Sequence, residues 1–542
     1  MKSRSRKQLL KDIDWKVTLI PLIGIVVLAV LFTNFPREST FVLDGLRSFI
    51  TENFGFYYIL IGFGMFLMSM YIAFSKYGGI KLGDIEEPEY STVKWGAMIF
   101  TSTMAADIVF YSLCEWALYA SEPHIMTMGG VQKWASTYPL FHWGPIAWSI
   151  YTVLAVAFGF MIHIRDRNRQ KFSEACRPIL GNRVDGGWGK LIDLIAVFSL
   201  LAGTATTFSL ATPLLSEAVS HVFGFSSSVG LTVMILLLIA FVYTLTVWFG
   251  MKGISRLAVG CSYLFFVLLA YVLFAGGETV YIIETGISSL GNLVQNFIGL
   301  ATDMDPMRET SFTQNWTIFY WSYWMVWCVA TPFFVGLISK GRTIKNTILG
   351  AYAYGLAGTF TSFIVLGNYG LSQQLKGNIN IIDDVLSSRA VSHSIISIFE
   401  TLPFPSFGLI LLVVTMIAFY ATTFDALTMV ISSYSYKRLE AGKEPGKRVR
   451  TFWAILFILL PIALIFSDNS INSLQSVAII AAFPIGLIVL LIVGSFLKDA
   501  SAYLSGDEPF EREEAIRDRE LEKSLKEEEA ISYSKTFKSK NM

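Results

Sequence analysis

Long apolar stretches alternate with short polar segments along most of this chain. A helix that crosses the hydrocarbon core of a bilayer needs about 20 mostly apolar residues. Twelve stretches meet this condition: residues 15–35, 57–75, 95–119, 143–162, 191–215, 229–251, 257–282, 316–338, 347–371, 407–432, 451–466 and 474–497. The pattern therefore predicts an all-α membrane protein with twelve transmembrane helices.

The distribution of Lys and Arg predicts how these spans are oriented. Short cytoplasmic loops of membrane proteins hold an excess of both residues, and here every second loop is rich in them. The loop after the fourth span, for example, holds Arg165, Arg167, Arg169, Lys171 and Arg177. An even number of spans places both termini on the side of the basic loops. We therefore expect a multi-pass protein of the cell membrane with both termini in the cytoplasm.

Several segments outside the spans also have a recognisable pattern. Residues 288–300 and 380–401 are too short or too polar to cross a bilayer and are predicted to form surface helices. The first apolar stretch follows residues 1–16 without a small-residue cleavage site, so we expect it to remain as the first span. Residues 510–530 interleave both charge signs at helical spacing, which fits a solvated helix or a regulatory tail that senses ions or anionic lipid.

The amino-acid composition supports a membrane location. Of the 542 residues, 54% are hydrophobic and 15% are charged, and the net charge of +1 gives no indication of a nucleic-acid partner. The mean hydropathy is +0.55. Four scattered cysteines without a CxxC motif predict free, mostly buried thiols. Aromatic residues make up 15% of the chain, more than two headgroup layers need, so some are expected to line a site.

Two aromatic clusters are candidates for that site. Trp143, Trp148 and Tyr151 lie at the start of the fourth predicted span, and the last two share a helix face. In the eighth span, tryptophans recur at every third residue at Trp321, Trp324 and Trp327. Facing indole rings can enclose a trimethylammonium cation, with roughly 0.5 to 2 kcal/mol of attraction per ring. Ordinary core packing is the alternative, and spacing alone does not separate the two.

The clusters resemble the betaine/choline/carnitine transporter family, and the likeness extends over residues 14–497. The matching motifs are W-x4-W-x2-Y at 143–151, and F-Y-W-x-x-W at 319–324 followed by I-S-K-G-R-T at 338–343. The run at 211–215 is similar to the carnitine branch. The resemblance implies a substrate cage with a lower ring on the permeation path. The cage would be Trp143, Trp148, Tyr151 and Trp324, the lower ring Trp327, and Tyr323 and Met104 are assigned to the same substrate site.

The resemblance also implies an architecture. Two inverted repeats of five helices, as in the leucine transporter, would follow two extra helices, with a broken first helix in each repeat. Assembly as a homotrimer is expected. The chain would divide into a cytoplasmic N-terminal segment (1–14), two peripheral helices (15–94), the first repeat (95–282), an outer surface helix (283–313), the second repeat (314–497) and a charged cytoplasmic tail (498–542).

Asp107 is the first candidate for ion coupling. It ends the segment 101–107, where many relatives have a glycine-rich break in the third span. An ionisable group at that depth is costly and suggests function. Asp107 could stay ionised beside a cation or take up a proton in each cycle, and the structural alternative is an N-cap on the second half of a broken helix. By resemblance, an acidic residue here goes with proton coupling and choline-like substrates.

Sodium is the alternative coupling ion. Thr422 and Thr423 in the tenth span resemble the paired hydroxyls of the family's sodium site, and oxygen ligands of this kind suit a hard cation. Threonines that hydrogen-bond back to their own helix are the alternative. By resemblance, sodium-independent carnitine exchangers carry an arginine at the position of Cys261. Its absence here implies that an ion or proton is required.

Other polar residues are expected to have structural roles. Glu115 and Glu217 lie near span ends and are expected to face water, Asp193 and Asp425 to cap or pair, and His142 to hydrogen-bond at the outer rim. We find no metal-ligand cluster, phosphate-binding glycine loop or nucleophile and base pair. Neither an enzyme nor a bound cofactor is therefore expected.

The leading interpretation is a secondary active transporter of a quaternary-ammonium solute of the choline, glycine betaine or carnitine class. The sequence favours a proton as the coupling ion, with sodium as the second candidate. The alternatives are a sodium-coupled osmosensing betaine uptake system regulated by its tail, a carnitine-type exchanger, and a channel. Alternating access through a binding cage argues against the channel.

Overall fold

A computed structural model describes residues 12–167, 169–249, 251–387, 391–437, 439, 444–466 and 471–507. Over these residues the chain is helical, and its β-structure is limited to two isolated bridges, Ile13 with Tyr436 and Lys81 with Thr343. The predicted all-α class is confirmed. Eight of the described helices are long and apolar enough to cross a membrane, or up to eleven if each of three bent pairs counts as one span. The predicted count of twelve is not confirmed.

The first part of the chain forms α2 to α10. Their bounds are α2 Trp15–Asn34, α3 Pro36–Phe74, η1 Lys76–Gly79, α4 Thr92–Thr103, α5 Ala106–Ala120, α6 Pro123–Thr127, α7 Val131–His142, α8 Pro145–His163, α9 Phe172–Ala175 and α10 Arg177–Leu180. Next come η2 Gly181–Asp185, α11 Gly187–Phe223, α12 Val229–Phe249, α13 Met251–Ala270, η3 Tyr271–Ala275 and α14 Thr279–Thr302.

The remaining elements follow the loop at 303–312. They are η4 Thr313–Thr317, α15 Ile318–Trp327, α16 Thr331–Leu337, α17 Ile344–Ser362, η5 Phe363–Gly367, α18 Asn368–Leu375, α19 Ile381–Leu386, α20 Val391–Glu400, α21 Pro405–Tyr434, α22 Lys447–Phe466 and α23 Ile471–Ser505. The predicted tail helix at 510–530 lies outside the described residues.

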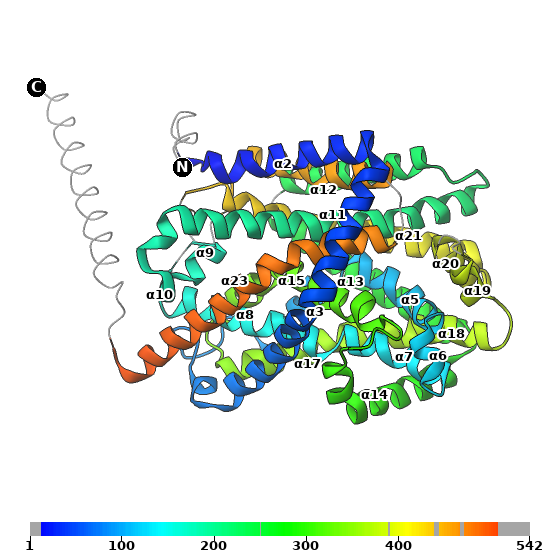
Figure 1. The fold of residues 1–542 in the computed structure, drawn as a ribbon, viewed down its shortest axis with the longest axis horizontal. Helices are drawn as coiled ribbons and strands as arrows, with labels where there is room; N and C mark the ends of the chain where they lie inside the picture. The colour runs from blue at the N-terminus through cyan, green and yellow to red at the C-terminus, as the bar shows by residue number, and fades with distance from the viewer. Residues whose placement is uncertain are drawn as a thin grey trace, which may run out of the picture.

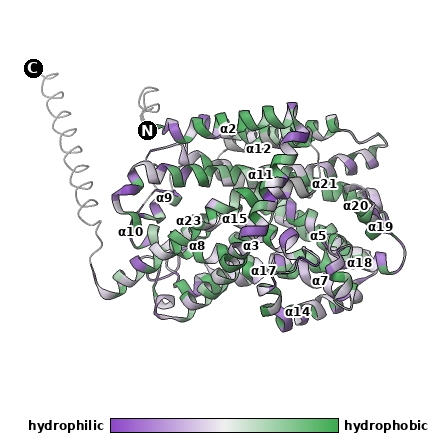
Figure 2. Ribbon diagram, viewed as in Figure 1, coloured by the Kyte–Doolittle hydropathy of each residue, from purple (hydrophilic) through white to green (hydrophobic). Residues whose placement is uncertain are grey.

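The helices α2 and α11 run roughly along the longest axis of the molecule, whereas α3 crosses it steeply and α23 runs obliquely (Figure 1). The start of α2 and the end of α23 lie at the same end of the bundle, next to α9 and α10, while α19 and α20 lie at the opposite end. Hydrophobic residues cover most of the length of α2 (Figure 2). This distribution is the one expected of helices that cross an apolar layer.

Two of the predicted spans are broken, as expected for the first helix of each repeat. The third is split into α4 and α5, which meet at an angle of 67°, and Met104 and Ala105 between them are extended. The eighth is split into α15 and α16, at 52°. A break frees backbone groups, which a membrane protein tolerates only inside the bundle.

Three helices differ from the predicted elements, and in two of them a polar side chain is covered by another helix. The helix α3 begins at Pro36 instead of residue 57, and its Arg47 donates to Asn315 over 3.1 Å. The sequence did not predict α7, whose Ser136 bonds Ser289 of α14 over 2.7 Å. The helix α14 itself begins at Thr279 instead of residue 288, after a bend of 111°.

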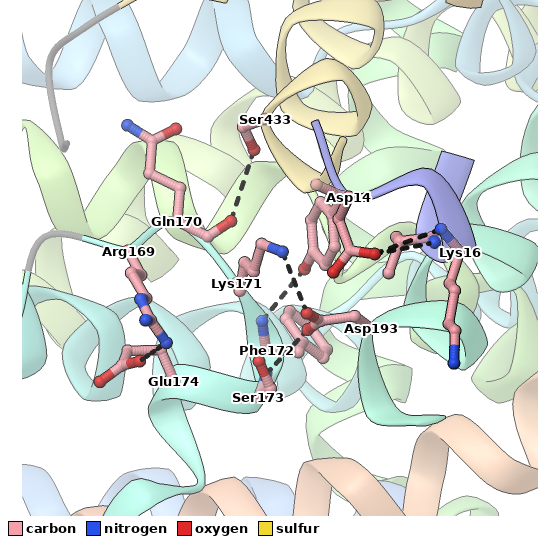
Figure 3. A network of polar contacts seen from close by, with 12 residues as sticks. Asp14, Lys16, Arg169, Gln170, Lys171, Phe172, Ser173, Glu174, Asp193 and Ser433 are labelled. Atoms are coloured by element: carbon pink, nitrogen blue, oxygen red, sulfur yellow. Dashed lines mark hydrogen bonds and ion pairs between the residues drawn. The ribbon is translucent and has the colours of Figure 1, made fainter. Parts of the chain in front are cut away.

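A polar network holds the connection between α8 and α11 (Figure 3). Lys171 and Asp193 form an ion pair at 3.3 Å, and the backbone N–H of Ser173 donates to the same aspartate. The carbonyl of Gln170 accepts from Ser433 at the end of α21 over 3.4 Å. An ion pair ties this connection to α11, and a neutral hydrogen bond ties it to α21.

Asp185, in this connection, should make the fold sensitive to acid. Its pKa is lowered to about 2, first because Arg177 donates hydrogen bonds to the carboxylate. The unfolded value is about 3.9, so the stabilisation is present above about pH 4 and is lost as pH falls toward about 2. We expect Asp185→Asn to unfold more easily than wild type at neutral pH, and this difference to shrink below about pH 4.

Thermal unfolding of the detergent-solubilised protein measures this difference. The Asp185 side chain is 42% exposed, so solvent screening keeps the effect below about 1 kcal/mol. Asp84→Asn, at an exposed aspartate, is the matched control. A difference for Asp185→Asn that stays constant down to about pH 2 would contradict the assignment.

Candidate functional site

Trp324 of α15 lies at the centre of a cluster of four aromatic rings. Its ring centroid is 5.7 Å from that of Trp143, 5.5 Å from that of Trp148 and 4.8 Å from that of Tyr151. All four side chains are buried. The two segments singled out in the sequence therefore meet, and we call these four residues the cage.

Two helices and the turn between α7 and α8 place these rings. Trp143 directly follows α7, and the chain turns at Gly144 and Pro145 into α8, which carries Trp148 and Tyr151 in its first two turns. A Cβ atom on Gly355 of α17 would lie 2.4 to 2.6 Å from the ring of Trp148. Only glycine at this position lets α17 pack against the cage.

The indole N–H groups of the cage differ in their partners. Those of Trp148 and Trp324 are buried without a hydrogen-bond partner. The indole of Trp143, in contrast, donates to Oε2 of Glu115 on α5 over 2.8 Å. The cage thus presents aromatic faces and two unpaired donors, and a carboxylate supports the third tryptophan.

Three further predicted site residues lie around the cage. The ring of Tyr323 is 6.4 Å from that of Trp143 and 6.3 Å from that of Trp327. Trp327 packs against Gly203 of α11. Met104 stands at the break between α4 and α5, and its methyl group lies against Gly358 of α17.

Asp107 is buried beside this cluster and bonded to it. The hydroxyl of Tyr323 donates to Oδ2 of Asp107 over 2.5 Å, and it also bonds Thr207 of α11. The N-cap alternative for Asp107 was wrong, because Ala105 is the cap residue and Asp107 lies inside the first turn of α5. A carboxylate there still interacts favourably with the positive end of the helix dipole.

The candidate sodium ligands show a different arrangement. The hydroxyl of Thr422 donates back to the carbonyls of Ala418 and Phe419, over 3.2 and 3.0 Å. Its oxygen lies 3.9 Å from the sulfur of Cys261. Thr423 is partly exposed. Cys261, Thr422 and Thr423, the three candidate ion-coupling positions in this region, are thus close together. The Thr422 hydroxyl is bonded to its own helix.

Comparison with known proteins shows the family of this chain. The model of the betaine/carnitine/choline family transporters matches residues 16–504. The chain belongs to this family. The match confirms the prediction of a membrane transporter and not an enzyme.

Two relatives in this family cover most of the chain. It is 28% identical over 462 residues to a carnitine transporter of Acinetobacter baumannii, with 84% of this chain and 83% of that protein covered. It is 29% identical over 481 residues to a glycine betaine transporter of Bacillus subtilis, with 86% and 90% covered. A solved Na⁺-coupled sialic acid symporter is similar with a TM-score of 0.40, at 15% identity and with 85% and 86% covered.

Two polar residues of this family member were placed wrongly from the sequence. Glu115 was expected to face water and His142 to lie at the outer rim, yet both are 0% exposed. Neighbouring helices cover both side chains, although they lie near the ends of apolar stretches. The expectations for Asp193 and Asp425 hold, since they pair with Lys171 and Arg450. Glu217 is partly exposed and lies 3.6 Å from His393.

Tyr323→Phe should destabilise this transporter, because it leaves the buried Asp107 without its tyrosine donor. A buried acceptor that loses its partner costs about 1 to 3 kcal/mol. Tyr111→Phe is the matched control, since the buried Tyr111 hydroxyl has no hydrogen-bond partner among the described residues. Thermal unfolding in detergent should show a lower midpoint for the first variant alone. Equal midpoints would contradict the importance of this hydrogen bond.

Proposed function

We propose that this protein is a secondary active transporter that carries a small quaternary-ammonium solute by alternating access. The observation that carries the proposal is the cage, in which three rings surround Trp324 inside the bundle. A trimethylammonium group has no proton to donate, so hydrogen-bond acceptors do not recognise it well. Aromatic faces do, and each contributes about 2 kcal/mol or more when water is excluded.

The proposed solutes are choline, glycine betaine and carnitine, which share this cationic head. The relatives named above carry carnitine or glycine betaine. The unpaired indole N–H groups of Trp148 and Trp324 could donate to the polar end of such a solute. Asp107, beside the cage, favours a solute with a net positive charge.

The structure favours a proton over sodium as the coupling ion. Asp107 lies at the helix break and bonds Tyr323 of the other broken helix. A carboxylate in this position can gain or lose a proton as the two helices move against one another. The hydroxyl of Thr422 is already bonded to its own helix, which leaves the sodium site as the weaker candidate.

The finer architecture belongs to the same proposal. We propose twelve spans arranged as two inverted repeats behind two extra helices, cytoplasmic termini, a cell-membrane location and a homotrimer. The two broken helices support the repeats, and the two ends of the described chain at one end of the bundle support an even number of spans (Figure 1).

The cage predicts that Trp324→Leu abolishes solute binding. Leucine keeps much of the bulk and removes the aromatic face that attracts the cation, so affinity should fall by at least about tenfold. Calorimetric titration with choline, glycine betaine and carnitine measures this loss. Trp95→Leu is the matched control, because Trp95 is equally buried but lies outside the cage. Wild-type affinity in the Trp324 variant would rule out the cage.

Asp107→Asn should uncouple transport from the proton gradient. In proteoliposomes, an inward proton gradient should accelerate uptake by the wild type and have no effect on the variant, because asparagine cannot carry the proton. Counterflow exchange should stay largely intact. An Asp107→Asn protein that still concentrates solute in response to a pH gradient would exclude this role.

Uptake measurements in the same proteoliposomes test whether sodium is the coupling ion. With an imposed sodium gradient at fixed pH, uptake by the wild type should not change, and neither should uptake by the Thr422→Ala, Thr423→Ala double variant. A sodium-driven rate that disappears in the double variant would support sodium coupling instead.

A further inference from the structure

A chain of hydrogen bonds leads away from the cage at Trp143. The indole of Trp143 donates to Oε2 of Glu115, and the hydroxyl of Tyr119 donates to Oε1. The same hydroxyl lies 2.6 Å from Nδ1 of His142, whose Nε2 is 3.0 Å from the hydroxyl of Thr317. Glu115, Tyr119 and His142 are all 0% exposed.

The surroundings of Glu115 hold no compensating cation. No ion pair joins this carboxylate to a Lys or Arg within the part of the chain that the structure describes. The titratable groups that face it are Tyr111, Cys114 and Tyr119 from α5, His142 from α7 and Tyr320 from α15. Tyr320 stacks on the His142 ring with centroids 4.8 Å apart. Other helices packed on α5 carry charge near the surface, at Asp383, Asp384, His393 and Glu400.

The chain satisfies its hydrogen bonds in two protonation states. With Glu115 ionised, Tyr119 donates to it, and Nδ1–H of neutral His142 donates to Tyr119. With one proton added, Glu115 donates to Tyr119, Tyr119 donates to Nδ1, and Nε2–H donates to Thr317. A proton that arrives at Nε2 can therefore reach Glu115 by single transfers along the existing bonds. A buried polar group without partners would be costly, and neither state leaves one.

We propose that Glu115, Tyr119 and His142 form a proton-binding site, separate from Asp107, whose occupancy sets the affinity of the cage for a cation. This inference rests on the proposed function of the cage. An ionised Glu115 adds negative charge next to Trp143 and polarises its indole, which strengthens the attraction between the ring and a cation. Protonation removes that charge. Acid conditions therefore weaken solute binding through Glu115, whatever the state of Asp107.

Binding titrations of the full chain in detergent test the proposal, with choline and glycine betaine as probes. The pH range runs from about 5.5 to about 8.5, around the usual pKa of histidine. For the wild type, Kd should rise about tenfold toward acid pH. Glu115→Gln keeps an acceptor for Trp143 but no charge, so its Kd should equal the acid wild-type value at every pH. Asp107→Asn should keep the weakening of binding toward acid pH that Glu115→Gln loses.

Two tyrosine variants test the chain itself. Tyr119→Phe removes the hydroxyl shared by Glu115 and His142 and should shift the midpoint of the pH dependence. Tyr138→Phe is the matched control, because its hydroxyl bonds His124 and lies outside the chain. A Glu115→Gln protein with the pH dependence of the wild type, or a pH dependence lost in Asp107→Asn, would overturn the proposal.

Infrared difference spectra separate this inference from the proposed function. Between about pH 8.5 and about pH 5.5, the C=O stretch of protonated carboxyls in the wild type should contain a component that is lost in Glu115→Gln and kept in Asp107→Asn. This signal needs no solute. If choline and glycine betaine fail to bind but the signal is present, the proposed function fails and the proton site stands. If both bind but the Glu115 signal is absent, the proton site fails and the proposed function stands.

Discussion

The hydrogen bond from Tyr323 to Asp107 connects the two broken helices of this transporter. Asp107 opens the second half of one broken helix, and Tyr323 belongs to the first half of the other. The same hydroxyl bonds Thr207, so three helices meet at one oxygen. Hydrogen bonds to charged groups contribute about 1.5 to 3 kcal/mol. Because Trp324 follows Tyr323 directly, this bond also fixes the rotation of α15 that turns Trp324 toward the other cage rings.

Much of the site could be predicted from the sequence. Tryptophan is rare and large, so the two aromatic clusters stood out from the apolar background, and the resemblance to the family selected Trp143, Trp148 and Trp324 within them. Asp107 was visible for the same reason, as a charge inside an apolar stretch. Its exact role in the helix was not predictable, since the cap position depends on where the backbone turns, and it turns at Met104 and Ala105.

The errors share one physical cause. Hydropathy along a chain measures the preference of each segment for lipid over water, but several segments here are surrounded by other helices of the protein. The sequence suggests that Ser136 of α7 and Arg47 of α3 face water, because their hydrogen-bond partners, Ser289 and Asn315, are far away in sequence. Glu115 was assigned to water for the same reason. Hydrogen bonds from Trp143 and Tyr119 offset the cost of burying the Glu115 carboxylate. Only the folded bundle brings His142 next to these residues.

The ion pairs at the end of α8 have a mechanical consequence. Arg165 and Arg167 follow α8 directly. Both form ion pairs with Asp499 near the end of α23, with N–O distances of 2.8 and 3.0 Å. The charged tail begins just beyond that helix. A displacement of the end of α23 would pull on these arginines and so on the helix that carries Trp148 and Tyr151. Two ion pairs thus make the positions of two cage rings depend on the position of the last helix.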